Sequence, residues 1–86
     1  MSERGERLVR EMEYFKTRTK PVTAQKLATA FGIARSTAQL DIEALQDYGC
    51  SFEVRSGNSG GYILIEAPSR LNVNFGQEIK IIQSEL

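Results

Sequence analysis

Residues 23–64 have the sequence TAQKLATAFGIARSTAQLDIEALQDYGCSFEVRSGNSGGYIL. In the first part of this stretch apolar residues recur every three or four positions, which predicts two short helices. Gly32 lies between them and suits the left-handed residue that ends a helix, and the second helix is expected from about Arg35 to Asp47. Alternating residues then predict a strand, and the glycine-rich residues 57–61 form the turn to a second strand.

Another helix is expected before this stretch, over residues 3–18, where apolar residues also follow helical spacing. Val22 suits a short strand that pairs with the hairpin, and Thr23 suits the N-cap of the next helix. The order of these elements predicts an α+β winged helix-turn-helix, with a three-helix core and a β-hairpin wing. Such a domain lies on duplex DNA with its last helix in the major groove.

The chain is predicted to contain one winged domain at residues 1–66 and a C-terminal strand and helix extension at residues 67–86. The extension is expected to act as a dimerisation or connector segment. A helix from about residue 77 to residue 85 is the first choice, and a strand over residues 78–82 is the alternative because β-branched residues dominate there. A chain of 86 residues has a thin core, so a homodimer is expected.

The composition excludes several classes of function. The sequence has no histidine and a single cysteine, Cys50, which excludes His-dependent catalysis, Cys/His zinc sites and an internal disulfide. No catalytic constellation or nucleotide-binding loop is present, so we expect no enzyme activity, cofactor, metal or small-molecule ligand. The apolar runs are too short for a membrane helix and the N-terminus is too charged for a secretory signal, so a cytoplasmic protein is expected.

The formal net charge is zero, but the charges are unevenly distributed along the chain. Between residues 14 and 40 every charged residue is basic, and between residues 41 and 53 every charged residue is acidic. A neutral protein of this kind can still present one positive face to phosphate groups. The alternative is that both segments are ordinary solvated faces.

A further pattern consists of Leu27-Ala28, Gly32-Ile33, Thr37, Asp41-Ile42, Leu45, Gly49 and Gly60-Gly61-Tyr62-Ile63-Leu64. Its spacing resembles the winged helix-turn-helix at the front of DeoR-type and WYL-domain bacterial regulators. The resemblance implies a DNA-binding domain, followed from residue 71 by a segment similar to the connector of WYL-type regulators. The sequence departs from the family at Ala34, where serine is usual, and at Gln39-Leu40, where arginine often precedes the aspartate.

The predicted DNA contacts form three groups. The recognition helix supplies Arg35, Ser36, Gln39 and Leu40; the wing supplies Arg55, Asn58 and Ser59; the phosphate anchors are Lys20, Thr23 and Lys26. Arg35 suits a guanine edge or a phosphate, Gln39 suits adenine, and Leu40 suits a thymine methyl group. Two structural alternatives stay open at this point: Leu40 could pack against the wing, and Gln39 could be an ordinary exposed residue.

These features predict that the chain binds double-stranded DNA as a small transcriptional regulator. An accessory DNA-binding factor of a plasmid or phage is an alternative, because it needs the same docked domain. A second alternative is a winged helix that binds protein and not DNA, which the neutral net charge and an exposed Leu40 would favour.

Overall fold

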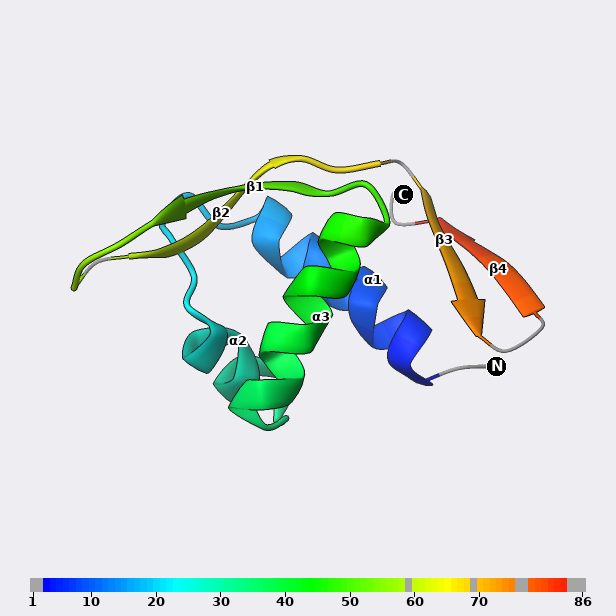
Figure 1. Ribbon diagram of the computed structural model, residues 1–86, viewed down its shortest axis with the longest axis horizontal. Coiled ribbons are helices and arrows are strands. Elements are labelled where there is room, and N and C mark those ends of the chain that lie inside the picture. The colour runs from blue at the N-terminus through cyan, green and yellow to red at the C-terminus, as the bar shows by residue number, and fades with distance from the viewer. Residues whose placement is uncertain (1–2, 59, 69, 76–77, 84–86) are drawn as a thin grey trace.

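The computed structural model describes residues 3–58, 60–68, 70–75 and 78–83. Within these residues the elements are α1 (Glu3–Lys16), α2 (Ala24–Phe31), α3 (Arg35–Asp47), β1 (Ser51–Arg55), β2 (Gly61–Glu66), β3 (Arg70–Phe75) and β4 (Glu78–Gln83). The helices pack together, and the β1–β2 hairpin extends past them at one end of the molecule (Figure 1). The predicted α+β winged helix-turn-helix is confirmed.

The ends of α2 follow from single residues. Thr23 precedes α2 in an extended conformation with ψ 163°, and its hydroxyl accepts a hydrogen bond from the Lys26 amide at 3.0 Å. Gly32 follows α2 in the left-handed region at φ 65°, where glycine has no Cβ to clash. Both predicted caps are confirmed, and α3 begins soon after at Arg35.

The core lies between α1 and the α2–α3 pair. Its large, fully buried apolar side chains are Leu8, Met12, Phe15, Leu27, Ile42 and Leu45. Burying each such side chain contributes about 1.5–3 kcal/mol relative to leaving it in water. Edge-to-face ring contacts continue this core into the hairpin, from Phe15 to Phe52 at 4.8 Å between centroids and from Phe52 to Tyr62 at 6.0 Å. The wing is therefore anchored on α1.

The wing is also joined to the segment between α1 and α2. On the edge of β2, the Val22 amide donates to the Tyr62 carbonyl at 2.9 Å, and the Tyr62 amide donates to the Val22 carbonyl at 2.8 Å. The predicted pairing of Val22 with the wing is confirmed. Gly61 is needed for this close approach, because its φ is 138° and a Cβ there would lie 2.7 Å from the Val22 carbonyl carbon.

The predicted C-terminal helix is wrong, and the alternative strand is correct. β3 and β4 form an antiparallel hairpin in which Leu71 pairs with Ile82. Ile79, Ile81 and Ile82 are β-branched, which disfavours a helix, and the alternating segment before them supplies the partner strand. Residues 77, 84 and 85 of that prediction lie outside the described residues. β4 lies beside α1, at the opposite end of the molecule from the wing tip (Figure 1).

Charged side chains are buried between α1 and α3. Asp41 is fully buried and accepts hydrogen bonds from Arg7 Nε at 2.8 Å, Arg7 Nη2 at 3.1 Å and Arg4 Nε at 3.2 Å. Glu11 is also fully buried, with its Oε2 3.6 Å from Arg7 Nε. We call Arg4, Arg7, Glu11 and Asp41 the buried charge cluster after its two buried carboxyl groups; the side chain of Arg7 is 25% exposed and that of Arg4 is 43% exposed. The sequence places Asp41 in an acidic segment, but the fold removes it from the surface.

The two carboxyl groups of the buried charge cluster titrate in opposite directions. Burial and the neighbouring Asp41 carboxylate raise the pKa of Glu11 to about 9, so Glu11 is protonated at neutral pH. Burial alone would raise the pKa of Asp41, but hydrogen bonds from Arg7 hold it below its usual value. Asp41 therefore carries the negative charge that the arginines face.

Candidate nucleic-acid interface

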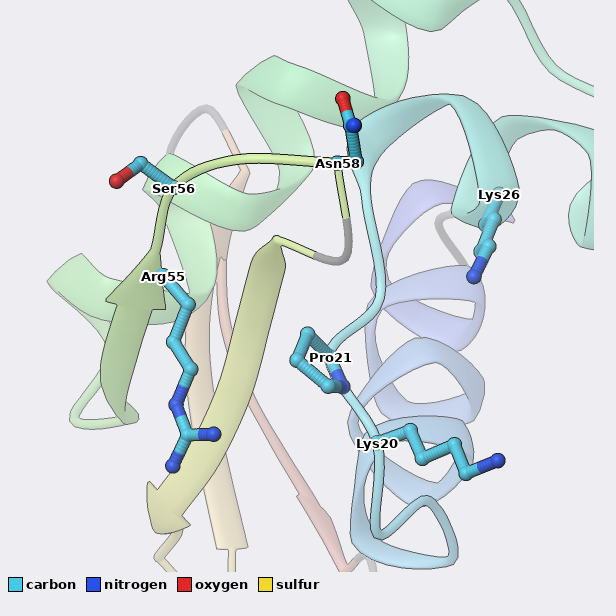
Figure 2. Close-up of a pocket in the computed structure, with 6 residues that line it drawn as sticks. All are labelled: Lys20, Pro21, Lys26, Arg55, Ser56 and Asn58. Carbon is cyan, nitrogen blue, oxygen red and sulfur yellow. The ribbon is translucent and has the colours of Figure 1, made fainter.

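A groove of about 550 Å³ separates the wing from the segment that leads into α2. Its lining residues are Lys20, Pro21, Lys26, Arg55, Ser56 and Asn58. We call it the wing groove. Figure 2 shows Pro21 in the middle, with Arg55 on one side and the lysines on the other. Cationic, hydroxyl and amide side chains in one groove are the donors that proteins use to hold the sugar-phosphate backbone of DNA.

Backbone contacts explain why these residues converge. Lys20 lies just before Val22, whose hydrogen bonds to Tyr62 fix the position of this segment beside the wing. Arg55 is the last residue of β1, and Lys26 lies in the first turn of α2. The wing groove is thus formed by the same contacts that hold the wing on the helices.

The wing groove brings together residues that the sequence assigned to separate groups. Lys20 and Lys26, predicted as phosphate anchors, line it with Arg55 and Asn58, predicted as wing contacts. Thr23 is not among its lining residues, and the oxygen of its hydroxyl accepts the cap hydrogen bond of α2. Ser59 lies outside the described residues. The predicted anchors and the predicted wing contacts therefore share one surface.

Arg55 is paired within the wing. Its Nε donates to Glu53 Oε2 at 3.0 Å, and the two side chains are 56% and 47% exposed. A solvent-exposed ion pair of this kind contributes only about 0–1 kcal/mol. A phosphate group can therefore replace Glu53 at little cost, and Arg55 stays available to an anion.

A smaller recess of about 280 Å³ lies at the N-terminal end of α3, lined by Arg35, Ser36 and Gln39. We call it the helix recess, and all three of its residues were predicted recognition contacts. Ala34 precedes α3 without a side-chain cap, so amides of the first turn remain available to an anion. Leu40 is 58% exposed, so it is not buried against the wing.

Gln39 is not the ordinary exposed residue that the sequence left open as an alternative. It is half-buried, and its Nε2 donates to the hydroxyl of Tyr62 at 3.2 Å. The sequence did not indicate this contact, because no spacing rule pairs a residue of α3 with one of β2. Ser56 and Pro21 were also missed as lining residues of the wing groove. For Ser56, its position next to Arg55 at the start of the glycine-rich loop was the available signal.

Other kinds of site find little support in the part of the chain that the structure describes. In these residues no group of three or more His, Cys, Asp and Glu side chains is placed to hold a metal ion. Burial raises the pKa of the Cys50 thiol to about 11, so the thiol is protonated at neutral pH and is a poor nucleophile. None of the described helices has the length and apolar character needed to cross a membrane.

The fold, together with the wing groove and the helix recess, defines a protein of the helix-turn-helix class. A comparison with family models agrees: a model described as "HTH domain" matches residues 7–63, which is more than half of the chain. The chain belongs to this helix-turn-helix family. The domain indicates DNA as the partner and is typical of proteins that are not enzymes. A search of curated proteins found no match.

Proposed function

We propose that the protein is a small transcriptional regulator that binds double-stranded DNA through residues 1–66. The observation that carries this proposal is the convergence of Lys20, Lys26 and Arg55 on the wing groove. The helix recess adds Arg35 at the free N-terminus of α3. Together they give a domain of zero net charge a local set of cations suited to phosphate groups.

In the proposed complex the N-terminal part of α3 enters the major groove. Arg35, Ser36, Gln39 and Leu40 then face base edges and the nearest phosphates. The wing groove holds the sugar-phosphate backbone beside it through Lys20, Lys26, Arg55 and Asn58, with Thr23 and Ser59 as further contacts. Phosphate contacts of this kind set the position of α3 without reading sequence.

Fluorescence anisotropy of a labelled generic duplex, measured at several salt concentrations, tests this proposal. Release of counterions predicts a slope of log K against log salt of about −0.9 for each phosphate contact. Arg55→Ala should weaken binding to all duplexes and reduce the size of the slope by about 1. Arg10→Ala is the matched control, because Arg10 is exposed on α1 and does not line the wing groove. If the folded protein does not bind duplex DNA at low salt, the proposal is wrong.

The regulatory role is supported by the resemblance of residues 27–64 to DeoR-type and WYL-domain regulators. An accessory factor of a plasmid or phage would use the same interface, and identification of the bound sites in a genome separates the two roles. Sites in promoters support a regulator, whereas a single cluster of sites at a replication or transfer origin supports an accessory factor.

We further propose that the protein is a homodimer and that residues 67–86 form the interface. The β3–β4 hairpin lies at the end of the molecule away from the wing tip, so a dimer formed there leaves the wing groove open (Figure 1). A two-stranded hairpin is marginally stable alone and gains from a partner surface. Half-sites in the DNA would then lie about 34–36 Å apart. Ile82→Asp should produce a folded monomer by light scattering and circular dichroism, and a monomeric wild-type protein would contradict the dimer.

A protein-binding role is the second candidate, and one observation favours it. Leu40 is 58% exposed on α3, where an apolar side chain also suits a protein partner. Leu40→Ala discriminates between the roles. It should change the preference at one base pair if α3 reads DNA, and it should leave duplex binding unchanged if Leu40 serves a protein partner.

A further inference from the structure

Tyr62 joins the recognition helix to the wing. The half-buried Gln39 of α3 donates from Nε2 to the Tyr62 hydroxyl at 3.2 Å. Gln39 is also one of the residues that line the helix recess, beside Arg35 and Ser36. A long glutamine side chain at the mouth of a recess would ordinarily sample several rotamers. The contact with Tyr62 restricts it.

Tyr62 itself is held from three directions. Its backbone amide and carbonyl are both hydrogen-bonded to Val22, at 2.8 Å and 2.9 Å. On the other edge of β2 it pairs with Val54 of β1. Its ring packs edge-to-face on Phe52, which packs on Phe15 of the core. The hydroxyl of Tyr62 is therefore a fixed point beside α3.

The Gln39 side-chain amide has hydrogen-bonding groups that the contact with Tyr62 does not use, and these groups remain available to DNA. The amide has two N–H donors and a carbonyl acceptor, and Tyr62 occupies one N–H. In a planar amide the N–H on the same side as the carbonyl forms with it an adjacent donor and acceptor pair, and this pair stays free when Tyr62 takes the N–H on the opposite side. That pair matches adenine N7, which accepts, and adenine N6, which donates, in the major groove.

We propose that Tyr62 is a positioning residue that presents the free edge of Gln39 to an adenine. This proposal rests on the proposed DNA-binding function and specifies how α3 reads one base pair. Because Tyr62 belongs to β2, the wing then has two roles. It lines the wing groove, and it also holds the side chain that reads the base.

The test begins with a duplex selected from a random pool by the wild-type protein. Affinities are then measured for this duplex and for variants in which each base pair in turn is replaced. Tyr62→Phe keeps the ring and removes the hydroxyl. Ordering a free glutamine on binding costs a factor of about 2 to 10, so the mutant should lose this factor at the adenine-containing site alone. Affinity for generic duplex should change far less than affinity for this site, and the melting temperature should fall by only a few degrees, as loss of one partly exposed hydrogen bond predicts.

Gln39→Ala and the double mutant complete a cycle. Loss of a bidentate contact to adenine should reduce discrimination at that base pair by about 5- to 150-fold. Adding Tyr62→Phe to Gln39→Ala should have no further effect on discrimination, because the hydroxyl would act only through Gln39. Additive effects of the two mutations would overturn the positioning role.

Gln39→Glu provides a variant with an altered base preference. A carboxylate can still meet the Tyr62 hydroxyl, which then donates, and its other oxygen accepts from cytosine N4. The preferred base at that position should change from adenine to cytosine, and Tyr62→Phe should weaken the new preference as well.

The outcomes separate this inference from the function on which it rests. Wild-type binding with an unchanged preference in Tyr62→Phe overturns the role of Tyr62 and leaves DNA binding intact. Absence of duplex binding by the wild-type protein overturns both. Side-chain ¹⁵N relaxation gives a readout in the free protein: the Gln39 amide should be rigid in the wild type and mobile in Tyr62→Phe, and a Gln39 amide equally mobile in both overturns the positioning role.

Discussion

Arg4 and Arg7 of α1 carry the same charge as the cations of the wing groove, but they meet a buried anion instead of an exposed one. Arg4 and Arg7 are directed at Asp41, which is fully buried, and Arg7 forms two of the hydrogen bonds that hold it. Arg55 has a partner that is itself 47% exposed, and it lines an open groove with Lys26. The first set stabilises the packing of α1 on α3, whereas the second set is available to a ligand.

A formal net charge of zero is compatible with a basic wing groove because Lys20, Lys26 and Arg55 are grouped there, whereas the buried charge cluster takes up two basic and two acidic residues alike. Asp41 counts as an acid in the sequence, but in the fold its charge is offset inside the protein by Arg7 and Arg4. Glu11 counts as an acid as well, but its raised pKa leaves it uncharged at neutral pH. The charges of the buried charge cluster therefore contribute little to the electrostatic potential around the wing groove.

The largest expected effect tests whether Asp41 supports the fold. Asp41→Asn leaves Arg7 without its buried anion and should lower the free energy of unfolding by about 3 kcal/mol in urea at neutral pH. We expect the lower end of the usual range because Glu11 can ionise and partly replace the lost charge. Asp47→Asn, at an exposed position of α3, should change stability by less than about 0.5 kcal/mol. An equal loss of unfolding free energy in the two mutants would contradict the claim that the buried Asp41 supports the fold more than the exposed Asp47.

A smaller effect concerns the pH dependence of stability. The pKa of Glu11 is about 9 in the folded protein and has an ordinary value of 4.5, so the unfolded chain releases its proton first as pH rises. The stability that this group contributes is therefore complete below pH 4.5 and is lost progressively towards pH 9.

Glu11→Gln removes the ionisation and should flatten this dependence. Between about pH 5 and pH 6.5 the wild type should lose about 2 kcal/mol more than the mutant, measured by urea unfolding at each pH. The matched control is Glu43→Gln at an exposed position on α3, which should retain the wild-type slope. A wild-type stability that does not fall over this range would contradict a protonated Glu11.

The smallest expected effects are those of replacing one cation in each region, Lys26 in the wing groove and Arg4 in the buried charge cluster. The two substitutions should change different measured quantities. Lys26→Ala should reduce the salt slope of duplex binding by about 1 and leave stability unchanged. Arg4→Ala should leave the slope unchanged and lower stability by about 1 kcal/mol or less, since its side chain is 43% exposed. If both mutations changed the salt slope alike, the proposed separation between the buried charge cluster and the wing groove would not hold.

Much of the fold could be predicted because its signals are local. Thr23 and Gly32 mark the ends of α2 by their side-chain chemistry, and Val22 is the extended residue that follows Pro21. The C-terminal strand could not be assigned with the same rules. A short run rich in isoleucine is compatible with a helix or a strand, and the pairing of β4 with β3 decides between them.

The candidate site was predictable by residue type but not by arrangement. Basic residues near the expected start of α2 and in the wing were identified, yet their convergence on one groove depends on the contact of Gly61 with Val22. The contact between Gln39 and Tyr62 likewise depends on how α3 packs beside β2. Such contacts join residues distant in sequence, and periodicity carries no information about them.

The bridge between Val22 and Tyr62 also has a consequence for the order of folding. Its two ends enclose α2 and α3, so it closes a long loop of chain whose entropy cost must be offset before the bridge is stable. The β1–β2 hairpin is local and can form early, but its docking requires helices already packed on α1. We therefore expect the wing to dock in a late step, and the wing groove, which exists only after docking, to be among the last surfaces that the folding chain acquires.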